Sequence, residues 1–185
     1  MSNSYFQFKQ FRIEQDRCAM KVGTDGVLLG AWANVSQART ILDVGAGTGL
    51  ISLMLAQRSA ADTQIQAIEI DTDANEQANS NFENSPWKER LSSLHVSLQD
   101  FLKKTHSSFD LIVSNPPYFI DSKKNPNEQR TLARHTDSLS YEELLCASTL
   151  LSDKGHFAVI LPHSENETFI ALAKEKGFYL THQTH

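Results

Sequence analysis

The chain has 185 residues, a length that fits one domain with a substantial core. Hydrophobic residues make up 40% and charged residues 21% of it, and its apolar runs fall far short of the about 20 residues that a membrane-spanning helix needs. The net charge of −5 argues against indiscriminate binding to polyanions. The N-terminus lacks a basic-then-apolar leader pattern, and the two cysteines lack metal-type spacing. We therefore expect a cytoplasmic protein with reduced thiols, no bound metal and no membrane segment.

The basic residues are unevenly spread along the chain. Eight of the 17 fall in the segments 1–21 and 121–135, namely Lys9, Arg12, Arg17, Lys21, Lys123, Lys124, Arg130 and Arg134. A cluster of this kind is more often an ordinary solvated surface than a binding surface. It becomes a candidate for binding only if both segments flank a site.

Residues 1–35 form a segment of their own character. Aromatic and β-branched residues near positions 6–8 and 11–13 predict two short β segments, paired as a hairpin. Residues 22–26 predict a turn that caps a helix over 27–33. We expect an N-terminal appendage, 1–35, that closes over a site on the main domain, 36–185.

From residue 40 onward, strand and helix patterns alternate. The predicted strands are 40–44, 64–70, 91–96, 109–114, 155–161 and the beginning of a sixth at 178–182. The predicted helices are 48–58, 71–84, 140–151 and 164–176. This alternation predicts an α/β fold, with a mostly parallel sheet that helices cover on both faces.

A glycine-rich loop, DVGAGTG at residues 43–49, follows the strand at 40–44 and leads into a helix. Glycines let the backbone turn sharply and let a ligand approach closely, and the helix N-terminus offers unpaired N–H groups. A dinucleotide fingerprint would require glycine at position 50, where this chain has Leu50. Asp43 precedes the loop, which suits a ligand with an ammonium group and would repel a pyrophosphate. The candidate contacts in the loop are Gly45, Gly47 and Gly49, and a tight turn without a ligand is the alternative.

Two further acids stand after predicted strands. Glu69 follows Gly47 by 22 residues and is placed to accept hydrogen bonds from ribose hydroxyls. Asp71 is an alternative to Glu69, although a helix cap is the favoured role for it. Asp100 is placed to accept from an adenine amino group, or else it caps a short helix over 101–104. An amino acid joined to adenosine would suit Asp43, Glu69 and Asp100 together, which points to S-adenosylmethionine as the cofactor.

The segment SNPPYF, residues 114–119, ends the strand predicted at 109–114. In a doubly wound sheet that strand lies beside the one at 40–44, so Asn115 would emerge next to the glycine loop. A planar amine is a poor nucleophile, and two acceptors that hold its N–H bonds would localise the lone pair. The side-chain oxygen of Asn115 and the carbonyl of Pro116 can be those acceptors, with Pro117 restricting the Pro116 backbone and Tyr118 offering a stacking face. The alternative is a proline-rich turn that only ends an inner strand.

These motifs resemble those of the Rossmann-like, S-adenosylmethionine-dependent amino-methyltransferases that carry NPPY. The stretch at 8–32, FKQFRIEQDRCAMKVGTDGVLLGAW, is more diagnostic, as are SPW at 85–87 and ARH at 133–135. Through them, nearly the whole chain is similar to the bacterial tRNA1(Val) (adenine(37)-N6)-methyltransferases.

The resemblance implies N6-methylation of an adenosine in the anticodon loop of a tRNA, at position 37, where an unpaired base can be extruded into a pocket. It implies that Thr24 and Asp25 close over the methionine end of the cofactor, with a helix N-cap as the alternative. The family continues with a further antiparallel strand, so residues 36–185 are expected to lack the last strand. The two basic segments would hold phosphates at the pocket mouth, through Arg17, Lys21, Lys123, Lys124, Arg130 and Arg134.

Three other functions stay open at this point. The same NPPY chemistry could act on a glutamine amide of a protein or on the exocyclic amine of an rRNA guanine. Leu50 and Asp43 argue against a nucleotide-binding oxidoreductase. A non-catalytic RNA-binding module would not need Asn115. The sequence leaves the oligomeric state open.

Overall fold

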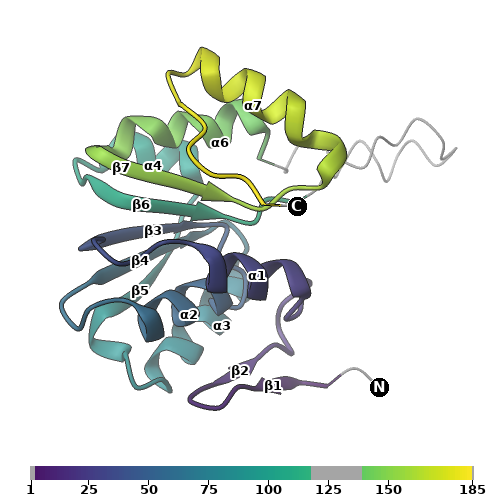
Figure 1. Cartoon of the computed structure of the whole chain (residues 1–185). Helices are drawn as coiled ribbons and strands as arrows, with labels where there is room; N and C mark the ends of the chain where they lie inside the picture. Colours follow the sequence, from purple (N-terminus) through teal and green to yellow (C-terminus); the bar gives the residue numbers. More distant parts are fainter. Residues whose placement is uncertain (1–2, 118–138, 185) are drawn as a thin grey trace, which may run out of the picture.

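A computed structural model describes residues 3–117 and 139–184 of the chain. Its centre is a parallel sheet with the strand order β5-β4-β3-β6-β7 (Figure 1). These strands are β3 (Thr40–Val44), β4 (Gln64–Glu69), β5 (Leu91–His95), β6 (Phe109–Ser114) and β7 (Leu151–Val159). Every neighbouring pair in this sheet runs parallel. The predicted α/β fold is confirmed.

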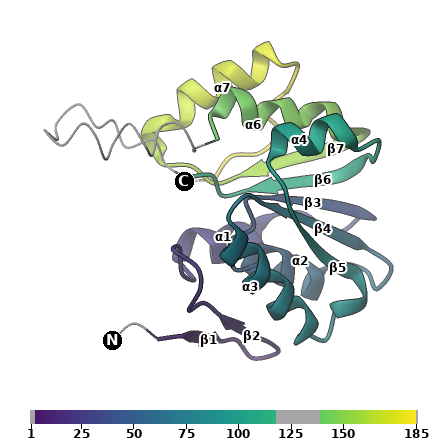
Figure 2. The ribbon, with the colours of Figure 1, turned by 180° about the vertical axis from the view of Figure 1, so that it is seen from behind.

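Helices cover both faces of the sheet, as Figures 1 and 2 show from opposite sides. One face carries α1 (Thr24–Trp32), α2 (Leu50–Arg58) and α3 (Thr72–Glu83), and the other carries α4 (Leu98–Lys104), α6 (Tyr141–Leu145) and α7 (Asn166–Glu175). Short 3-10 turns occupy Lys88–Arg90, Cys146–Leu150 and His163–Glu165. Within the described ranges, no helix is long and apolar enough to cross a membrane.

The inner strands are buried on both sides, which explains their nearly continuous apolar sequence. Along β3, Ile41 belongs to the core under α1–α3 and Leu42 to the core under α4–α7. Leu111 and Ile112 of β6 divide between the same two cores. All four side chains are at most 2% exposed, so the sheet is held in place from both faces.

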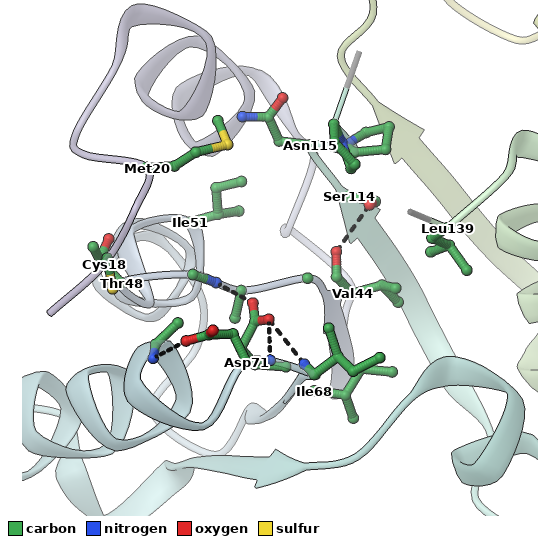
Figure 3. Close-up of a pocket in the computed structure, with 18 of the residues that line it drawn as sticks. Cys18, Met20, Val44, Thr48, Ile51, Ile68, Asp71, Ser114, Asn115 and Leu139 are labelled. Atoms are coloured by element: carbon green, nitrogen blue, oxygen red, sulfur yellow. Dashed lines mark hydrogen bonds between the residues drawn. The ribbon is translucent and has the colours of Figure 1, made fainter. Parts of the chain in front are cut away.

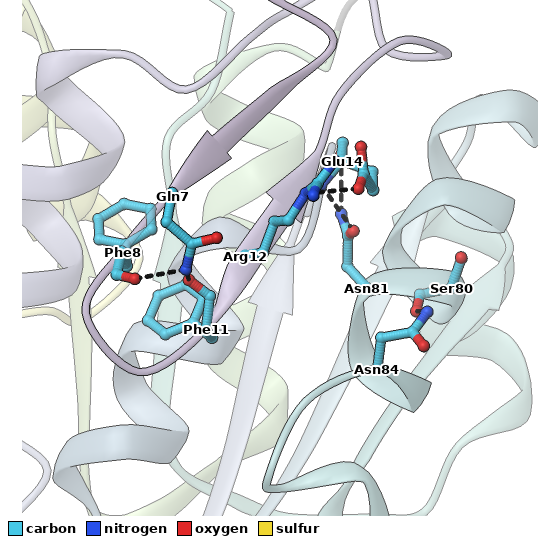
Figure 4. A network of polar contacts seen from close by, with 8 residues as sticks. All are labelled: Gln7, Phe8, Phe11, Arg12, Glu14, Ser80, Asn81 and Asn84. Atoms are coloured by element: carbon cyan, nitrogen blue, oxygen red, sulfur yellow. Dashed lines mark hydrogen bonds and ion pairs between the residues drawn. The ribbon is translucent and has the colours of Figure 1, made fainter.

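The N-terminal hairpin consists of β1 (Tyr5–Gln7) and β2 (Arg12–Glu14), as predicted. It is fixed to α3 by a reciprocal pair of hydrogen bonds (Figure 4), because Glu14 N donates to Asn81 Oδ1 and Asn81 Nδ2 donates to Glu14 O, both at 2.9 Å. Phe11 and Ile13 are buried in the core beneath. The hairpin therefore packs on the main domain and shares its core.

The largest differences from the predicted boundaries are found at two helices and at the last strand of the sheet. The first begins at Thr24, earlier than the predicted residue 27, with Gly23 as its N-cap. The helix predicted over 140–151 ends as α helix at Leu145, and a 3-10 turn completes it. Strand β7 then begins at Leu151, where it pairs with Phe109, before the predicted residue 155.

The sixth strand predicted at 178–182 is wrong: residues 178–184 have no regular secondary structure. Gly177, with φ 84°, ends α7 in the left-handed conformation, and Phe178 N donates back to Ala173 O. Phe178 packs edge-on against Phe157 of β7, and Trp32 Nε1 donates to Thr184 Oγ1 at 3.1 Å. Side chains hold this segment against β7 and α1, and a strand would require paired backbone groups instead.

We predict that Gly49→Ala destabilises the fold by about 3 kcal/mol. Gly49 caps α2 with φ 78°, and an added Cβ would lie 2.5 Å from a ring carbon of Phe82 in α3. Urea denaturation measures the loss. Gly177→Ala is the matched control, because its φ is also positive but no described atom lies within 4 Å of the added Cβ. An equal loss in both variants would show that the contact with Phe82 is irrelevant.

Candidate active site

A cavity of about 580 Å3 opens at the carboxyl ends of β3, β4, β5 and β6 (Figure 3). In the strand order of the sheet, β4 lies on one side of β3 and β6 lies on the other, so the direction in which strands are added reverses at β3. Ligands of open α/β sheets bind at such a reversal, and the volume lies in the usual range for small-molecule pockets. The N-terminal residues 18–21, the first turn of α1, and Leu139 and Glu143 complete the walls.

The pairing of β3 with β6 sets the centre of this cavity. Val44 lies opposite Ser114 in the parallel register, and Ser114 Oγ donates to Val44 O at 2.8 Å. The next residue of each strand is therefore Gly45 on one side and Asn115 on the other. Asn115, Pro116 and Pro117 line the cavity, as the sequence predicts for the beginning of SNPPYF.

The glycine loop presents open backbone to the cavity. Gly45 and Gly47 have positive φ, at 75° and 54°, and a Cβ added to either would meet no described atom within 4 Å. The loop is fixed from below, since Gly45 N and Ala46 N both donate to Ile68 O. A side chain at either glycine would project into the space where a ligand would lie, so these two positions form a cradle.

Glu69 lines the cavity and holds the loop in position. Its Oε2 accepts from Gly47 N at 2.8 Å, and its Oε1 accepts from Ile70 N at 2.8 Å and Asp71 N at 3.0 Å. The spacing of 22 residues between Gly47 and Glu69 thus corresponds to a direct contact. Asp71 Oδ1 accepts from Ala74 N, which confirms the favoured role of Asp71 as the cap of α3.

Asp43 does not lie where a direct ammonium contact requires it. It is fully buried, is not among the residues that line the cavity, and its Oδ2 accepts from Ser52 N at 3.1 Å and Ser52 Oγ at 2.7 Å. Its Oδ1 has no hydrogen-bond partner among the described residues. Burial raises the pKa of Asp43 to about 6, although the hydrogen bonds from Ser52 oppose the rise. The carboxylate ties the glycine loop to α2 from beneath.

The surroundings of Asp100 do not fit the predicted contact with an adenine amino group. Its carboxylate turns outward to Lys103 Nζ at 2.8 Å, and that contact is the main reason why its pKa is lowered. Ser97 caps α4, which begins at Leu98, so Asp100 is not the cap either. The residues of this turn that line the cavity are Ser97, Leu98 and Gln99.

Gln99, rather than its neighbour Asp100, is positioned to accept a hydrogen bond from an adenine amino group. Gln99 Nε2 donates to Glu143 Oε1 at 2.9 Å, which uses the amide nitrogen and leaves the carbonyl oxygen as an acceptor. Glu143 also accepts from Ser140 N, the main cause of its lowered pKa. The position of Gln99, in the first turn of the helix that follows β5 and next to an acid, was the signal that sequence reasoning could have used.

The other predicted site residues divide into three groups. Asp25 and Lys21 line the cavity, whereas Thr24 and Gly49 do not. Arg17 is turned towards α3, where its guanidinium contacts Glu76 at 3.3 Å. Outside the described residues lie Tyr118, Lys123, Lys124, Arg130 and Arg134.

Sequence reasoning treated Cys18 only as a reduced structural thiol, yet Cys18 lines the cavity together with Met20. Burial, together with the negative charges of Glu69 and Asp71, raises the pKa of Cys18 to about 11. At neutral pH the group is a thiol, so it contributes a small apolar surface and no nucleophile.

The charged groups of the cavity suit a cation. Among the described residues that line it, four are acids, Asp25, Glu69, Asp71 and Glu143, and one is basic, Lys21. Such a wall favours a sulfonium and an ammonium group and disfavours a pyrophosphate. Together with the open glycine cradle, it fits S-adenosylmethionine.

A second cavity of about 1180 Å3 lies between α1, β7, α7 and residues 178–184. It is larger, but its lining is mainly apolar and includes neither the glycine loop nor Asn115. Size alone therefore does not identify the active site here.

We predict that Asp43→Asn changes the pH dependence of stability. Because the pKa of Asp43 rises from 3.8 to about 6 in the folded chain, its contribution to the free energy of unfolding is fully present below pH 4 and is lost as the pH rises through 6. The amide that replaces the carboxyl group in the variant does not titrate. The stability of the wild type relative to this variant should thus fall by about 2 kcal/mol between pH 4 and pH 7.

Urea denaturation of both proteins across this pH range measures the difference. Groups such as Asp110, whose pKa is lowered mainly by the backbone N–H of Arg39, act in the opposite sense but cancel in the comparison. Parallel curves for the two proteins would contradict the prediction.

Comparison with known proteins identifies the family. Residues 21–162 match the family described as "Methyltransferase small domain". The chain is 55% identical over 186 residues to the tRNA1(Val) (adenine(37)-N6)-methyltransferase of Phocaeicola vulgatus, an alignment that covers 100% of this chain and 77% of that protein. It is 53% identical to the protein of the same name from Flavobacterium psychrophilum, covering 94% of this chain and 75% of the relative.

Solved structures show the same fold at lower identity. TrmN from Thermus thermophilus aligns with a TM-score of 0.61 and 21% identity, over 85% of this chain and 42% of that one. A putative S-adenosylmethionine-dependent methyltransferase from Streptococcus mutans aligns with a TM-score of 0.67 and 14% identity, over 94% of this chain and 46% of that one. The chain is thus an S-adenosylmethionine-dependent methyltransferase, and it belongs to the family of the bacterial tRNA1(Val) (adenine(37)-N6)-methyltransferases.

Proposed function

We propose that this protein methylates N6 of the adenosine at position 37 in the anticodon loop of tRNA1(Val). The observation that carries the proposal is the position of Asn115, one residue beyond the Val44–Ser114 pair and beside the open backbone of Gly45. An amide at this point lines the cavity in which a methyl donor on the glycine cradle would lie. The names of the relatives supply the substrate.

Asn115 and Pro116 are the proposed acceptors for the two N–H bonds of the target amine. When they hold both bonds, the nitrogen lone pair is less delocalised into the ring and is directed at the methyl group. Pro116 is buried and Pro117 follows it, so the backbone carbonyl between the two rings has little freedom. Such preorganised acceptors need no reorganisation during the reaction.

S-adenosylmethionine supplies an electrophilic methyl group on a sulfonium when it is bound. Gly45 and Gly47 would allow its close approach, and Glu69 would accept from the ribose hydroxyls. We assign the adenine amino group to the carbonyl oxygen of Gln99, because Glu143 orients that amide. Asp25 is the acid best placed for the methionine end.

The target amine can lose its proton after transfer, so the protein does not need a strong base. In-line alignment of the nitrogen with the methyl group supplies the remaining acceleration. Tyr118 stays the predicted stacking face, and the basic residues at 123–134 stay predicted phosphate contacts. Lys21, at the cavity, is the described cation best placed to meet an RNA backbone.

The direct test is nucleoside analysis of bulk tRNA after incubation with the purified protein and S-adenosylmethionine. N6-methyladenosine is the expected product, at position 37 of tRNA1(Val). Labelling of a glutamine-containing protein or of rRNA in place of tRNA would move the assignment to the other NPPY substrates. Absence of transfer to any of the three would contradict the proposal.

We predict that Asn115→Ala lowers the rate of methyl transfer by about 10²–10³-fold, the usual cost of removing one preorganised group. The dissociation constant for S-adenosylmethionine, measured by calorimetry, should change little because the cofactor contacts remain. Asn84→Ala is the control, since Asn84 Nδ2 donates to the nearby Ser80 O at an exposed end of α3 (Figure 4). A full rate in Asn115→Ala would show that another group accepts from the target amine.

We predict that Gln99→Ala weakens S-adenosylmethionine binding by about tenfold, the effect of one lost hydrogen bond in a partly buried site. Asp100→Ala should leave that affinity unchanged, because the Asp100 carboxylate faces Lys103. Calorimetry on the two adjacent variants separates the assignments. The reverse order of effects would restore Asp100 as the adenine contact.

A further inference from the structure

Met20 is mostly exposed although it is an apolar side chain at the wall of a binding cavity, a property it shares with Ile70, directly after β4, which is 60% exposed. It lines the cavity of Asn115 and the glycine loop, yet 61% of it is accessible to solvent. Exposing this much apolar surface to water costs free energy. A ligand that covers the side chain would recover that free energy.

The exposure does not come from a loose segment. On one side of Met20, Arg17 N donates to Gln77 Oε1 at 3.1 Å, and on the other, Val22 N donates to Gln15 Oε1 at 2.8 Å. Cys18, two residues before Met20, is buried. The backbone that carries Met20 is therefore anchored on both sides, to α3 before Met20 and to Gln15, directly after β2, behind it.

Met20 lies at the Asn115 end of the cavity. Figure 3 shows its thioether extending from the N-terminal segment towards Asn115, with Ile51 of α2 drawn nearby, whereas Ile68 and Asp71 lie at the other end. Ile51 is buried and lines the same cavity. This end thus combines a hydrogen-bonding amide with two apolar side chains, while Asp71, whose N–H donates to Glu69, lies towards the opposite end.

We propose that Met20 packs against one face of the target adenine and forms, with Asn115, the slot that receives the extruded base. The inference rests on the proposed function and adds a substrate contact to it. Hydrogen bonds to Asn115 and Pro116 act at the edge of the base and leave its two faces to be covered. A thioether is polarisable and flexible, and it makes favourable contacts with aromatic rings. An extruded base has lost its stacking partners in the RNA, so a new apolar contact offsets part of that cost.

The test is steady-state kinetics with full-length tRNA1(Val) and S-adenosylmethionine. Met20→Ala should raise KM for tRNA by about tenfold, with the cofactor dissociation constant unchanged. Met20→Leu, which keeps the apolar volume, should restore KM to within about threefold of the wild type. Leu28→Ala is the matched control, because Leu28 is 53% exposed but lines only the second cavity, and it should leave KM unchanged.

The outcomes separate this inference from the function on which it rests. If the wild type forms N6-methyladenosine and Met20→Ala has the KM of the wild type, the Met20 contact is wrong and the proposed function stands. If Met20→Ala weakens S-adenosylmethionine binding instead, Met20 is a cofactor contact and the inference is overturned. If the wild type methylates no tRNA, both proposals fall together.

Discussion

The active site depends on the alignment of two parallel strands that are far apart in the sequence. Val44 and Ser114 face each other at the ends of β3 and β6, and the hydroxyl of Ser114 closes the pair by donating to the Val44 carbonyl. A shift of one residue would turn every side chain of β6 to the opposite face and bury the wrong set. Since both faces of these strands are packed, the cores that stabilise the fold also fix the position of Asn115 relative to the glycine loop.

The acids around the glycine loop have structural tasks before any ligand arrives. Asp43 accepts from Ser52, and Glu69 accepts from three backbone N–H groups, so both carboxylates hold the loop in its open conformation. The buried charge of Asp43 costs stability above pH 6, as its raised pKa shows. A cavity that binds a cation is thus built at the expense of the stability of the fold. Such a trade-off between stability and activity is common in enzymes.

The sequence predicted those parts of the molecule that depend on local patterns and on strand ends. Periodicity located the strands up to Ser114, and the rule that ligands bind at carboxyl ends located Glu69 and Asn115. It did not reveal which way a side chain turns: Asp43 and Asp100 have the expected chemistry, but Ser52 holds the first inward and Lys103 holds the second outward. Gln99 and Met20 were missed because their proposed roles arise from tertiary contacts, with Glu143 and with the anchored N-terminal segment.

The charges of the site also explain how an acidic protein can act on a polyanion. The cavity is lined by Glu69, Asp71 and Glu143, which would repel phosphates that approached within the screening length of about 8–10 Å at physiological salt. An extruded adenine carries no charge, so it can enter where its backbone cannot. The same acids attract a cationic cofactor, and Lys21 at the cavity is the proposed phosphate contact. In the proposed complex, base extrusion separates the two electrostatic demands in space: the sulfonium would lie among the acids, the neutral base between Asn115 and Met20, and the phosphates outside.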